Sequence, residues 1–209
     1  MNVLIVDDHE LVREGLKKVL LKHSDIKLVG EATNGEELFD ILREAEVSLV
    51  ILDITLPGRS GLDLIHDLRS QYPKLHILIL SMHPEERFAL RALKAGASGY
   101  LSKDAAATEL INAIRKISGG GRYISASLAE HLANNLDKDL GKLPHENLSN
   151  REFEILRLIG KGKSVGQIAE ELMLSVNTIT SYRTRMMEKM NFTSTAQIIR
   201  YVIEHNLVE

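Results

Sequence analysis

The sequence predicts an α/β domain with a five-stranded parallel sheet, followed by a small all-α domain that contains a helix-turn-helix. Three observations support this prediction. Apolar runs alternate five times with segments of helical period before residue 118. Residues 47–52 are apolar apart from Ser48, as in a strand buried on both faces of a parallel sheet. After residue 148 only helical periods remain.

The five strands are expected at residues 3–6, 27–30, 49–52, 77–80 and 99–101. The helices between and after them are expected at residues 10–22, 35–43, 62–71, 85–95 and 105–118. Strands that alternate with amphipathic helices favour a doubly wound sheet, and five strands fit its flavodoxin-like version. In such a sheet the functional site lies at the carboxyl ends of the strands.

Polar side chains stand where the predicted strands end. Asp7 and Asp8 follow the first strand, Asp53 the third, Ser81 the fourth and Lys103 the fifth. Three carboxylates at one edge repel one another unless a cation lies among them. Such oxygen ligands suit Mg²⁺, which also binds phosphate oxygens, and a lysine and a hydroxyl can bind phosphate too. The pattern predicts a carboxylate that accepts a phosphoryl group as a nucleophile.

Composition excludes several classes of protein. The chain has 209 residues, 44% hydrophobic and 26% charged, which is typical of soluble globular proteins. It has no Cys, which excludes disulfides and thiolate zinc sites, and its eight His show no paired metal-ligand spacing. No apolar run approaches the roughly 18 residues of a membrane span, and the first residues lack the basic start of a secretory signal. We therefore expect a cytoplasmic protein with no membrane partner.

Residues 119–147 are predicted to link two domains, residues 1–118 and residues 148–209. Three consecutive glycines, residues 119–121, end the fifth helix. Ser125 is expected to cap a short helix over residues 126–135, and the polar residues 137–147 are expected to form a flexible tether. A hinge here would let the state of one domain change the packing of the other.

Four helices are predicted after residue 148. Ser149, followed by Glu152 three residues later, is a helix-capping pattern, and Ser164 and Ser175 stand before the second and third helices. The third helix is expected over residues 176–190 and the fourth over residues 195–205. The turn at residues 173–175 joins the second and third helices as in a helix-turn-helix.

The first domain resembles the receiver domain of two-component response regulators at the following residues: Asp7, Asp8, Asp53, Ser81, Tyr100 and Lys103. The resemblance implies that Asp53 is the phosphoacceptor. It also implies that Asp8 binds Mg²⁺ directly, that Asp7 binds it directly or through water, and that the backbone carbonyl of Thr55 is a further ligand. By the same resemblance Ser81 is the switch hydroxyl, Tyr100 the switch aromatic residue and Lys103 the phosphate-binding lysine.

The second domain resembles the LuxR-type DNA-binding domain at the following residues: Leu148, Ser149, Asn150, Arg151, Glu152, Gly162, Ile168, Ala169, Leu172, Ser175, Thr178 and Ile179. Joined to a receiver, it makes the NarL/FixJ branch of response regulators. The resemblance implies that residues 176–190 form the recognition helix and that its DNA-binding residues are Asn177, Thr178, Thr180, Ser181, Tyr182, Arg183, Thr184, Arg185 and Lys189.

The recognition helix is expected to divide its contacts by chemistry. The hydroxyls of Thr180, Ser181 and Thr184 can meet base edges with little inherent base preference. The phosphates are expected to be bound by Tyr182, Arg183, Arg185 and Lys189. Many relatives carry Lys where Thr180 stands and His where Tyr182 stands.

The two resemblances together imply a transcriptional regulator that is controlled by phosphorylation of Asp53. The implied partners are a sensor histidine kinase and double-stranded promoter DNA, and RNA polymerase is a further candidate. Residues 121–209 carry 11 Lys and Arg against 11 Asp and Glu, whereas a DNA-binding domain is expected to be basic. We therefore expect phosphorylation to favour a homodimer that binds paired half-sites.

Two alternatives stay open. A phosphohydrolase of the haloacid dehalogenase type also uses an Asp nucleophile at a strand end, but it needs a second Asp two residues later, where this chain has Thr55. We therefore expect no turnover of small molecules. In the other alternative the receiver is a passive dimerisation module of a DNA-binding protein, which would not need the acidic residues and Lys103.

Overall fold

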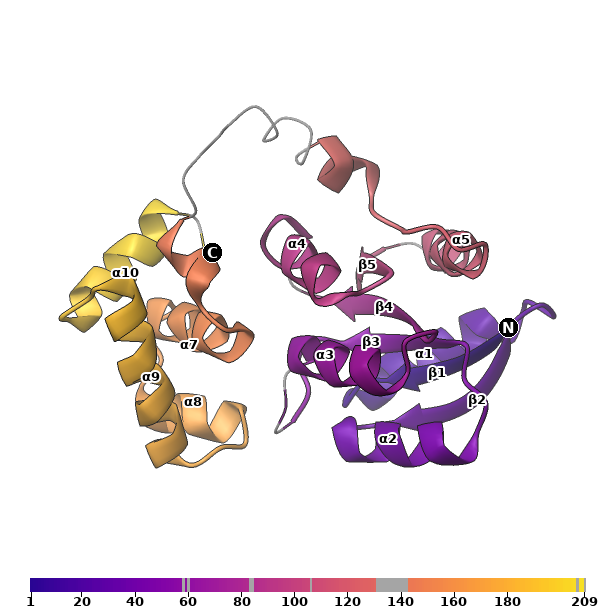
Figure 1. The fold of residues 1–209 in the computed structure, drawn as a ribbon, viewed down its shortest axis with the longest axis horizontal. Coiled ribbons are helices and arrows are strands. Elements are labelled where there is room, and N and C mark those ends of the chain that lie inside the picture. Colours follow the sequence, from indigo (N-terminus) through magenta and orange to yellow (C-terminus); the bar gives the residue numbers. More distant parts are fainter. Residues whose placement is uncertain are drawn as a thin grey trace. The chain divides into compact units, whose positions relative to one another are not determined.

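The computed structural model describes residues 1–57, 59, 61–82, 85–105, 107–130, 143–205 and 207–208, the side chains of residues 86 and 87 excepted. The chain divides into two compact units, Met1–Asp137 and Lys138–Glu209, which are described separately below (Figure 1). Residues 131–135 of the predicted short helix and residues 137–142 of the predicted tether lie outside the described residues.

The first unit is built on five parallel strands. They are β1 (Asn2–Val6), β2 (Lys27–Ala32), β3 (Leu49–Asp53), β4 (His76–Ser81) and β5 (Gly99–Ser102). Their order in the sheet is β2-β1-β3-β4-β5, which confirms the predicted doubly wound, flavodoxin-like fold. After β2 the chain returns past β1 to β3, so the switch in direction lies between β1 and β3, where open sheets of this kind place their sites.

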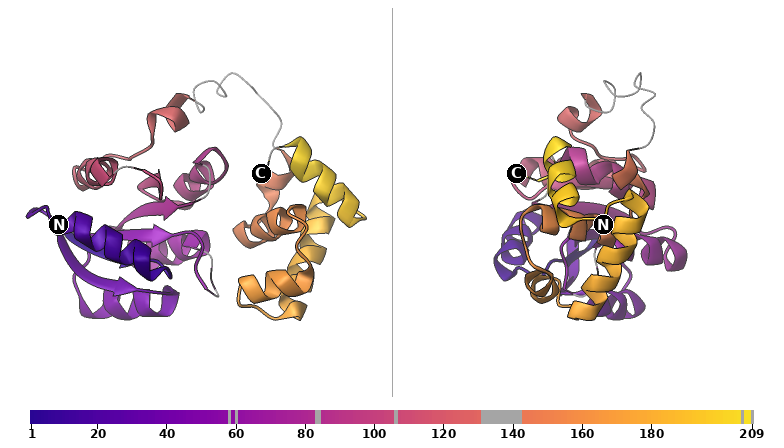
Figure 2. Two further views of the ribbon diagram at one scale, coloured as in Figure 1. Left: turned by 180° about the vertical axis from the view of Figure 1, so that it is seen from behind. Right: turned by 90° about the vertical axis from the view of Figure 1, so that its left-hand side faces the viewer.

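Five helices cover both faces of this sheet. They are α1 (Glu10–Leu20), α2 (Gly35–Glu44), α3 (Gly61–Gln71), α4 (Glu85–Ala95) and α5 (Ala107–Ser118). Apolar residues of α1 and α5 share one core with alternate residues of the strands, and the other three helices lie against the opposite face (Figures 1 and 2). Every residue of β3 is buried, because helices cover it on both sides. The predicted helix over residues 85–95 has the bounds of α4, and the ends of the other predicted elements differ from those observed by at most two residues.

The chain after α5 runs beside the last strand of the sheet. Tyr123 forms a parallel bridge with Gly99. Its N–H donates to the carbonyl of Ser98 at 3.0 Å, and its carbonyl accepts from the N–H of Tyr100 at 3.2 Å. Residues 126–130 are helical, and the Ser125 hydroxyl oxygen caps them by accepting from the N–H of Leu128. We call residues 122–130 the edge segment. Through Tyr123 this segment pairs with the outer edge of β5.

The second unit consists of short capped helices. They are the 3₁₀ helix η1 (Pro144–Asn147) and the α-helices α7 (Asn150–Gly160), α8 (Val165–Glu171), α9 (Val176–Met190) and α10 (Thr195–Glu204). Capping boxes begin α7 at Ser149 and α8 at Ser164, and the Ser175 hydroxyl caps α9, as the sequence predicted. No helix in the described part of the chain is long and apolar enough to cross a membrane.

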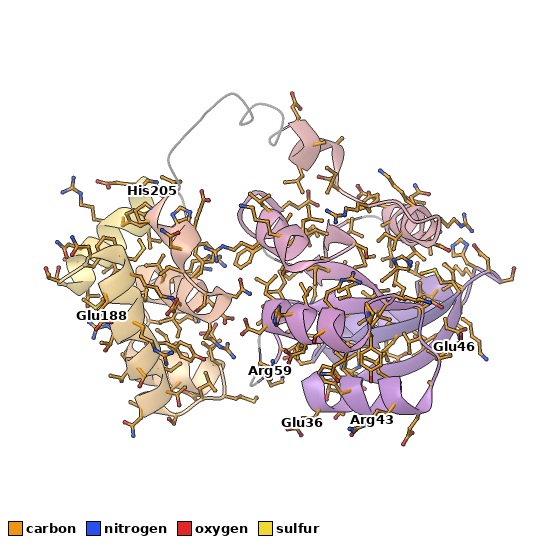
Figure 3. The ribbon with its side chains drawn as sticks, in the orientation of Figure 1. Glu36, Arg43, Glu46, Arg59, Glu188 and His205 are labelled. Carbon is orange, nitrogen blue, oxygen red and sulfur yellow. The ribbon has the colours of Figure 1, made fainter. Side chains whose placement is uncertain are left out.

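The end of the predicted tether is ordered. Nδ1 of His145 in η1 lies 2.8 Å from the hydroxyl of Tyr201, and its ring packs on Phe153 with 5.7 Å between centroids. His205, labelled in Figure 3, completes the aromatic cluster at 4.2 Å from the Tyr201 ring. The expectation of a flexible tether is therefore wrong for residues 144–147, because a single 3₁₀ turn leaves no helical period in the sequence.

Candidate functional site

Strand register brings two carboxylates to the switch point of the sheet. Val6 in β1 pairs with Leu52 in β3, so the next residues, Asp7 and Asp53, come level with one another. Their exposed fractions are only 1% and 2%. Buried carboxylates need partners, because taking a charge out of water is costly.

Lys103 provides the partner for both carboxylates. Its Nζ lies 2.7 Å from Oδ2 of Asp53 and 2.6 Å from Oδ2 of Asp7, and its side chain is 6% exposed. It follows β5, and its backbone N–H donates to the carbonyl of Ser81 at 2.9 Å, which fixes its position at the edge of the sheet. Residues far apart in the sequence therefore meet as one ionic cluster.

Burial changes the acid–base properties of this cluster. Burial, with a smaller contribution from the Asp7 carboxylate, raises the pKa of Asp53 to about 6, even though the Lys103 ammonium acts in the opposite direction. Burial lowers the pKa of Lys103, but the Asp53 and Asp7 carboxylates more than offset this, so its pKa lies above the ordinary value. The Asp53 carboxylate is therefore more basic than an exposed one, and a nearby cation would stabilise its ionised form.

Two further residues open the cluster to solvent. The Asp8 side chain is 35% exposed, and Nδ1 of His9 lies 2.8 Å from Oδ1 of Asp8 and 3.1 Å from Oδ1 of Asp7. One donor atom each of Asp7, Asp8, His9 and Asp53 falls within 4.8 Å of the others. This set of mainly carboxylate oxygens fits a hard divalent cation. The sequence favours a helix-start residue at His9 rather than a ligand, and His9 does stand at the start of α1. Its place beside Asp7 and Asp8 was the only sign that it could also join the cluster.

The loop after β3 is held against Asp53. The N–H of Thr55 donates to Oδ1 of Asp53 at 3.2 Å. The N–H of Gly61 donates to the carbonyl of Ile54 at 2.8 Å, where α3 begins. A Cβ on Gly61 would lie 2.1 Å from the carbonyl oxygen of Asp53, so only glycine permits this close approach. The backbone around the carboxylate is thereby fixed.

Ser81 and Tyr100 stand on the two strands next to this edge. Leu80 pairs with Asp53, so Ser81 lies one residue further toward the carboxyl end, and it is fully buried. Tyr100 pairs with Ile79 in β4, and its side chain is fully buried as well. Of the two predicted switch residues, Ser81 thus lies on the strand next to the one that ends in Asp53, and Tyr100 lies on the strand that leads to Lys103.

In the second unit, α9 has one buried side and one exposed side. Ile179, Met186 and Met190 are buried, which fixes the rotation of the helix. The exposed residues among those predicted to bind DNA are Asn177, Thr180, Ser181, Thr184, Arg185 and Lys189. Thr178 is partly exposed, and its hydroxyl oxygen lies 2.8 Å from that of Ser175 at the cap.

The cationic side chains of α9 contact their own domain. Arg183 donates to the hydroxyl of Thr195 at 3.0 Å, and the Arg185 guanidinium lies 5.0 Å from the centroid of the Tyr182 ring. Lys189 forms an ion pair with Glu152 at 2.7 Å. The two arginine contacts are at the surface, where such contacts are weak enough to be exchanged for contacts with phosphate. The carboxylate of Glu152 is buried, so Lys189 is held more firmly than the arginines.

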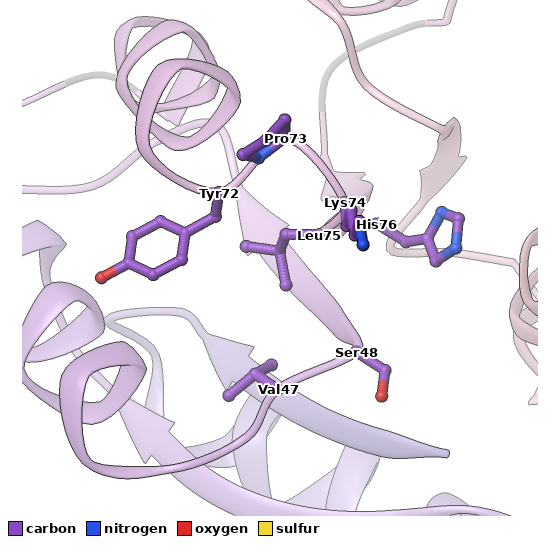
Figure 4. A pocket seen from close by; sticks show the side chains of 7 residues that line it. All are labelled: Val47, Ser48, Tyr72, Pro73, Lys74, Leu75 and His76. Atoms are coloured by element: carbon purple, nitrogen blue, oxygen red, sulfur yellow. The ribbon is translucent and has the colours of Figure 1, made fainter.

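A pocket of about 450 Å³ lies elsewhere, at the amino ends of β3 and β4. Val47 and Leu75 face one another across it in Figure 4. Its lining is Val47, Ser48, Tyr72, Pro73, Lys74, Leu75 and His76. These residues precede or begin the strands whose other ends carry Asp53 and Ser81, so the pocket is separate from the carboxylate cluster.

Comparison with known families identifies both units. Residues 3–115 match the response regulator receiver domain, and residues 146–202 match the bacterial regulatory proteins of the luxR family. The response regulator UvrY of Escherichia coli K12 is 38% identical over 208 residues, which cover 99% of this chain and 95% of UvrY. The response regulator GacA of Pseudomonas aeruginosa is 33% identical over 210 residues, which cover 100% of this chain and 98% of GacA.

Solved structures of RcsB from Salmonella are similar over nearly the whole chain. RcsB bound to the rprA promoter in the presence of the phosphomimetic BeF₃⁻ has a TM-score of 0.67 at 27% identity, covering 96% of this chain and 97% of RcsB. A structure of two RcsB dimers bound to two parallel DNAs has a TM-score of 0.62 at 27% identity, covering 97% of both chains. The present chain therefore belongs to the NarL/FixJ branch of response regulators, in which a receiver domain is joined to a LuxR-type DNA-binding domain.

Proposed function

We propose that this response regulator accepts a phosphoryl group on Asp53 from a sensor histidine kinase and then binds promoter DNA as a dimer through α9. The buried cluster of Asp53, Asp7 and Lys103 carries the proposal, because it joins a basic carboxylate to a cation that can bind phosphate oxygens. Residues 1–118 would form the receiver, residues 119–147 the linker and residues 148–209 the DNA-binding domain. Acting on promoters, the protein would work in the cytoplasm, with RNA polymerase as a further candidate partner.

The residues that would hold Mg²⁺ are Asp8, Asp53, Asp7 and the backbone carbonyl of Thr55. When bound, the ion would offset the repulsion among the carboxylates and the incoming phosphate. Partial exposure of Asp8 supports this assignment, since Mg²⁺ keeps several waters and needs an open side. His9 would have to turn away for the Asp8 carboxylate to become free for a cation, because its Nδ1 now lies 2.8 Å from Oδ1 of Asp8.

The transfer would proceed by displacement at phosphorus. A carboxylate oxygen of Asp53 attacks the phosphorus of the phosphohistidine on the kinase. The new bond is P–O and the bond that breaks is P–N. The ring nitrogen that held phosphorus keeps the electron pair and takes a proton from water, so that the histidine leaves as neutral imidazole. Lys103 exchanges its contact with Asp53 for one with the phosphoryl oxygens, so its charge stays compensated throughout.

Phosphate on Asp53 would then act on the neighbouring strand. Ser81 would donate its hydroxyl to a phosphoryl oxygen, and the Tyr100 ring would occupy the space that Ser81 leaves. The burial of both side chains supports this coupling, since a buried group moves only if its neighbours adjust. The resulting change of surface would favour the dimer, as in the similar RcsB structures that contain dimers on DNA.

The proposal is tested by mass spectrometry after incubation with acetyl phosphate. Wild-type protein should gain one phosphoryl group in Mg²⁺ and none in excess chelator, and Asp53→Asn should gain none. Asp40→Asn, on the exposed side of α2, is the matched control and should behave as wild type. An unchanged adduct in Asp53→Asn would refute the assignment of Asp53.

The same samples test the second step. Sedimentation and a DNA titration, with and without beryllofluoride, should show dimer fraction and DNA affinity rising together. Full DNA affinity in the unmodified monomer would instead support the passive dimerisation module.

A further inference from the structure

We propose that α9 selects base edges that carry amino groups, namely adenine N6 and cytosine N4, because its outward hydroxyls can only accept hydrogen bonds. This inference rests on the proposed role of α9 as the recognition helix and names what that helix reads. The residues concerned are Thr180, Ser181 and Thr184, all of which are exposed.

Each of these hydroxyls already donates its hydrogen to the helix itself. Thr180 Oγ1 lies 2.8 Å from the carbonyl oxygen of Val176. Ser181 Oγ lies 2.9 Å from that of Asn177, and Thr184 Oγ1 lies 3.0 Å from that of Thr180. A carbonyl oxygen cannot donate, so the direction of all three bonds is fixed by chemistry.

What these hydroxyls offer outward follows from that direction. A hydroxyl has one hydrogen to donate and two lone pairs that accept. With the hydrogen directed at a carbonyl, only the acceptor capacity is left for a ligand. Positions 180 and 184 are about one helical turn apart, and position 181 lies beside them, so the three acceptors form a continuous strip.

A strip of acceptors can form hydrogen bonds with only some of the base edges in the major groove. Adenine N6 and cytosine N4 carry hydrogens, whereas guanine O6 and N7 and thymine O4 are acceptors. An acceptor placed against an acceptor leaves both unpaired in a dehydrated interface, which is unfavourable. The strip should therefore bind where amino groups lie and avoid the acceptor edge of guanine.

Two neighbours reinforce this preference. Asn177 is exposed at the start of the strip, and the amide of asparagine pairs with N6 and N7 of adenine. Glu188, labelled in Figure 3, is exposed four residues after Thr184 and adds a carboxylate, which also accepts. The arginines of this helix, Arg183 and Arg185, are assigned to phosphates rather than to base edges, so they do not oppose this preference.

Base analogues test the inference on the full chain with beryllofluoride. The preferred site is first selected from random DNA, and each base of a half-site is then replaced singly. Replacing adenine by purine, or cytosine by 2-pyrimidinone, removes only the amino group and should weaken binding about ten-fold at two or more positions. Replacing guanine by 7-deazaguanine should change binding less than two-fold. The reverse pattern would overturn the inference.

Protein variants supply the second arm. Thr180→Val and Thr184→Val keep the branched shape of the side chain and remove the acceptor. Each variant should bind the natural half-site about ten-fold more weakly. Each should also bind equally well to the natural half-site and to the analogue that lacks the amino group read by the missing hydroxyl. Thr193→Val, in the loop before α10, is the control, since its hydroxyl contacts Gln197 instead. If a variant fails to fold, the analogue scan on wild type still decides.

The experiments distinguish failure of the proposed DNA-binding role of α9 from failure of the proposed preference for amino groups. Absence of binding to any DNA, at low salt and with beryllofluoride, would refute the proposed function of α9. Sequence-selective binding that depends on guanine N7 and ignores the amino groups would refute this inference and leave the proposed function standing.

Discussion

Lys103 holds its ammonium nitrogen 2.7 Å from the Asp53 carboxylate, and both side chains are almost entirely removed from water. A second contact, at 2.6 Å, joins the same nitrogen to Asp7. The lysine therefore compensates two buried charges before any phosphate arrives. Its loss affects the stability of the receiver as well as phosphate binding.

Lys103→Met should destabilise the receiver by about 3 kcal/mol at pH 7, because it leaves two carboxylates buried and uncompensated. Adding Asp7→Asn should restore part of the loss, since one carboxylate is then removed. Chemical denaturation of wild type, the single variant and the double variant measures both effects. Equal stability of wild type and Lys103→Met would show that the ion pairs contribute nothing.

Gly61→Ala should impair the phosphoacceptor site, because the new Cβ would lie 2.1 Å from the carbonyl oxygen of Asp53 and must displace that backbone. The rate of phosphorylation by acetyl phosphate should fall at least ten-fold. Gly15→Ala is the matched control, since nothing lies within 4 Å of a Cβ at that position of α1. It should leave the rate unchanged and stabilise the helix by about 0.5–1 kcal/mol. Similar rates in the two variants would contradict the close approach.

Ser81→Ala should separate phosphorylation of Asp53 from the dimerisation and DNA binding that we expect to follow it. Asp53 should still take phosphate, because Lys103 remains, while the dimer fraction and DNA affinity stay low. Shifting the receiver from mostly inactive to mostly active takes about 5.5 kcal/mol, and each charge-assisted hydrogen bond contributes roughly 1.5–3 kcal/mol. The loss of the Ser81 hydrogen bond therefore removes a large share of the free energy that drives the shift. Sedimentation and DNA titration of the phosphorylated variant provide the measurement. Normal dimerisation would exclude Ser81 from the switch.

Arg183→Ala should weaken binding to specific and unrelated DNA by the same factor and reduce the salt slope by about one, as expected for a phosphate contact. Arg43→Ala, on α2 and labelled in Figure 3, should leave both quantities unchanged. Fluorescence anisotropy over a range of salt concentrations gives the slopes. A change of sequence preference with an intact slope would instead assign Arg183 to base reading.

The sheet could be predicted because its signals are local. Buried strands such as residues 49–52 are apolar throughout, and the polar residue that ends each one marks the carboxyl edge, so Asp7, Asp53 and Lys103 could be assigned together. The helix caps at Ser149, Ser164 and Ser175 were likewise visible in the sequence, since a capping serine acts within three residues of itself.

Other features depend on contacts between distant residues. Nothing near Tyr123 indicates that it pairs with β5, and nothing near His145 indicates that it packs on Tyr201 in α10. The hydroxyls of α9 show a different limit. Their residue types were evident, but whether each donates outward or to the helix depends on rotamers that a sequence does not contain.

The edge segment, residues 122–130, also has a consequence for self-association. The outer edge of a terminal strand carries backbone donors and acceptors that can recruit a strand from another molecule. In this chain Tyr123 occupies the N–H of Tyr100 and the carbonyl of Ser98, and the buried side chain of Leu128 anchors the segment. A receiver truncated after residue 118 would expose that edge and become prone to strand addition and aggregation, whereas one that ends at residue 130 would stay protected. The first part of the interdomain linker thus protects the edge of the sheet from pairing with a second molecule of the same protein.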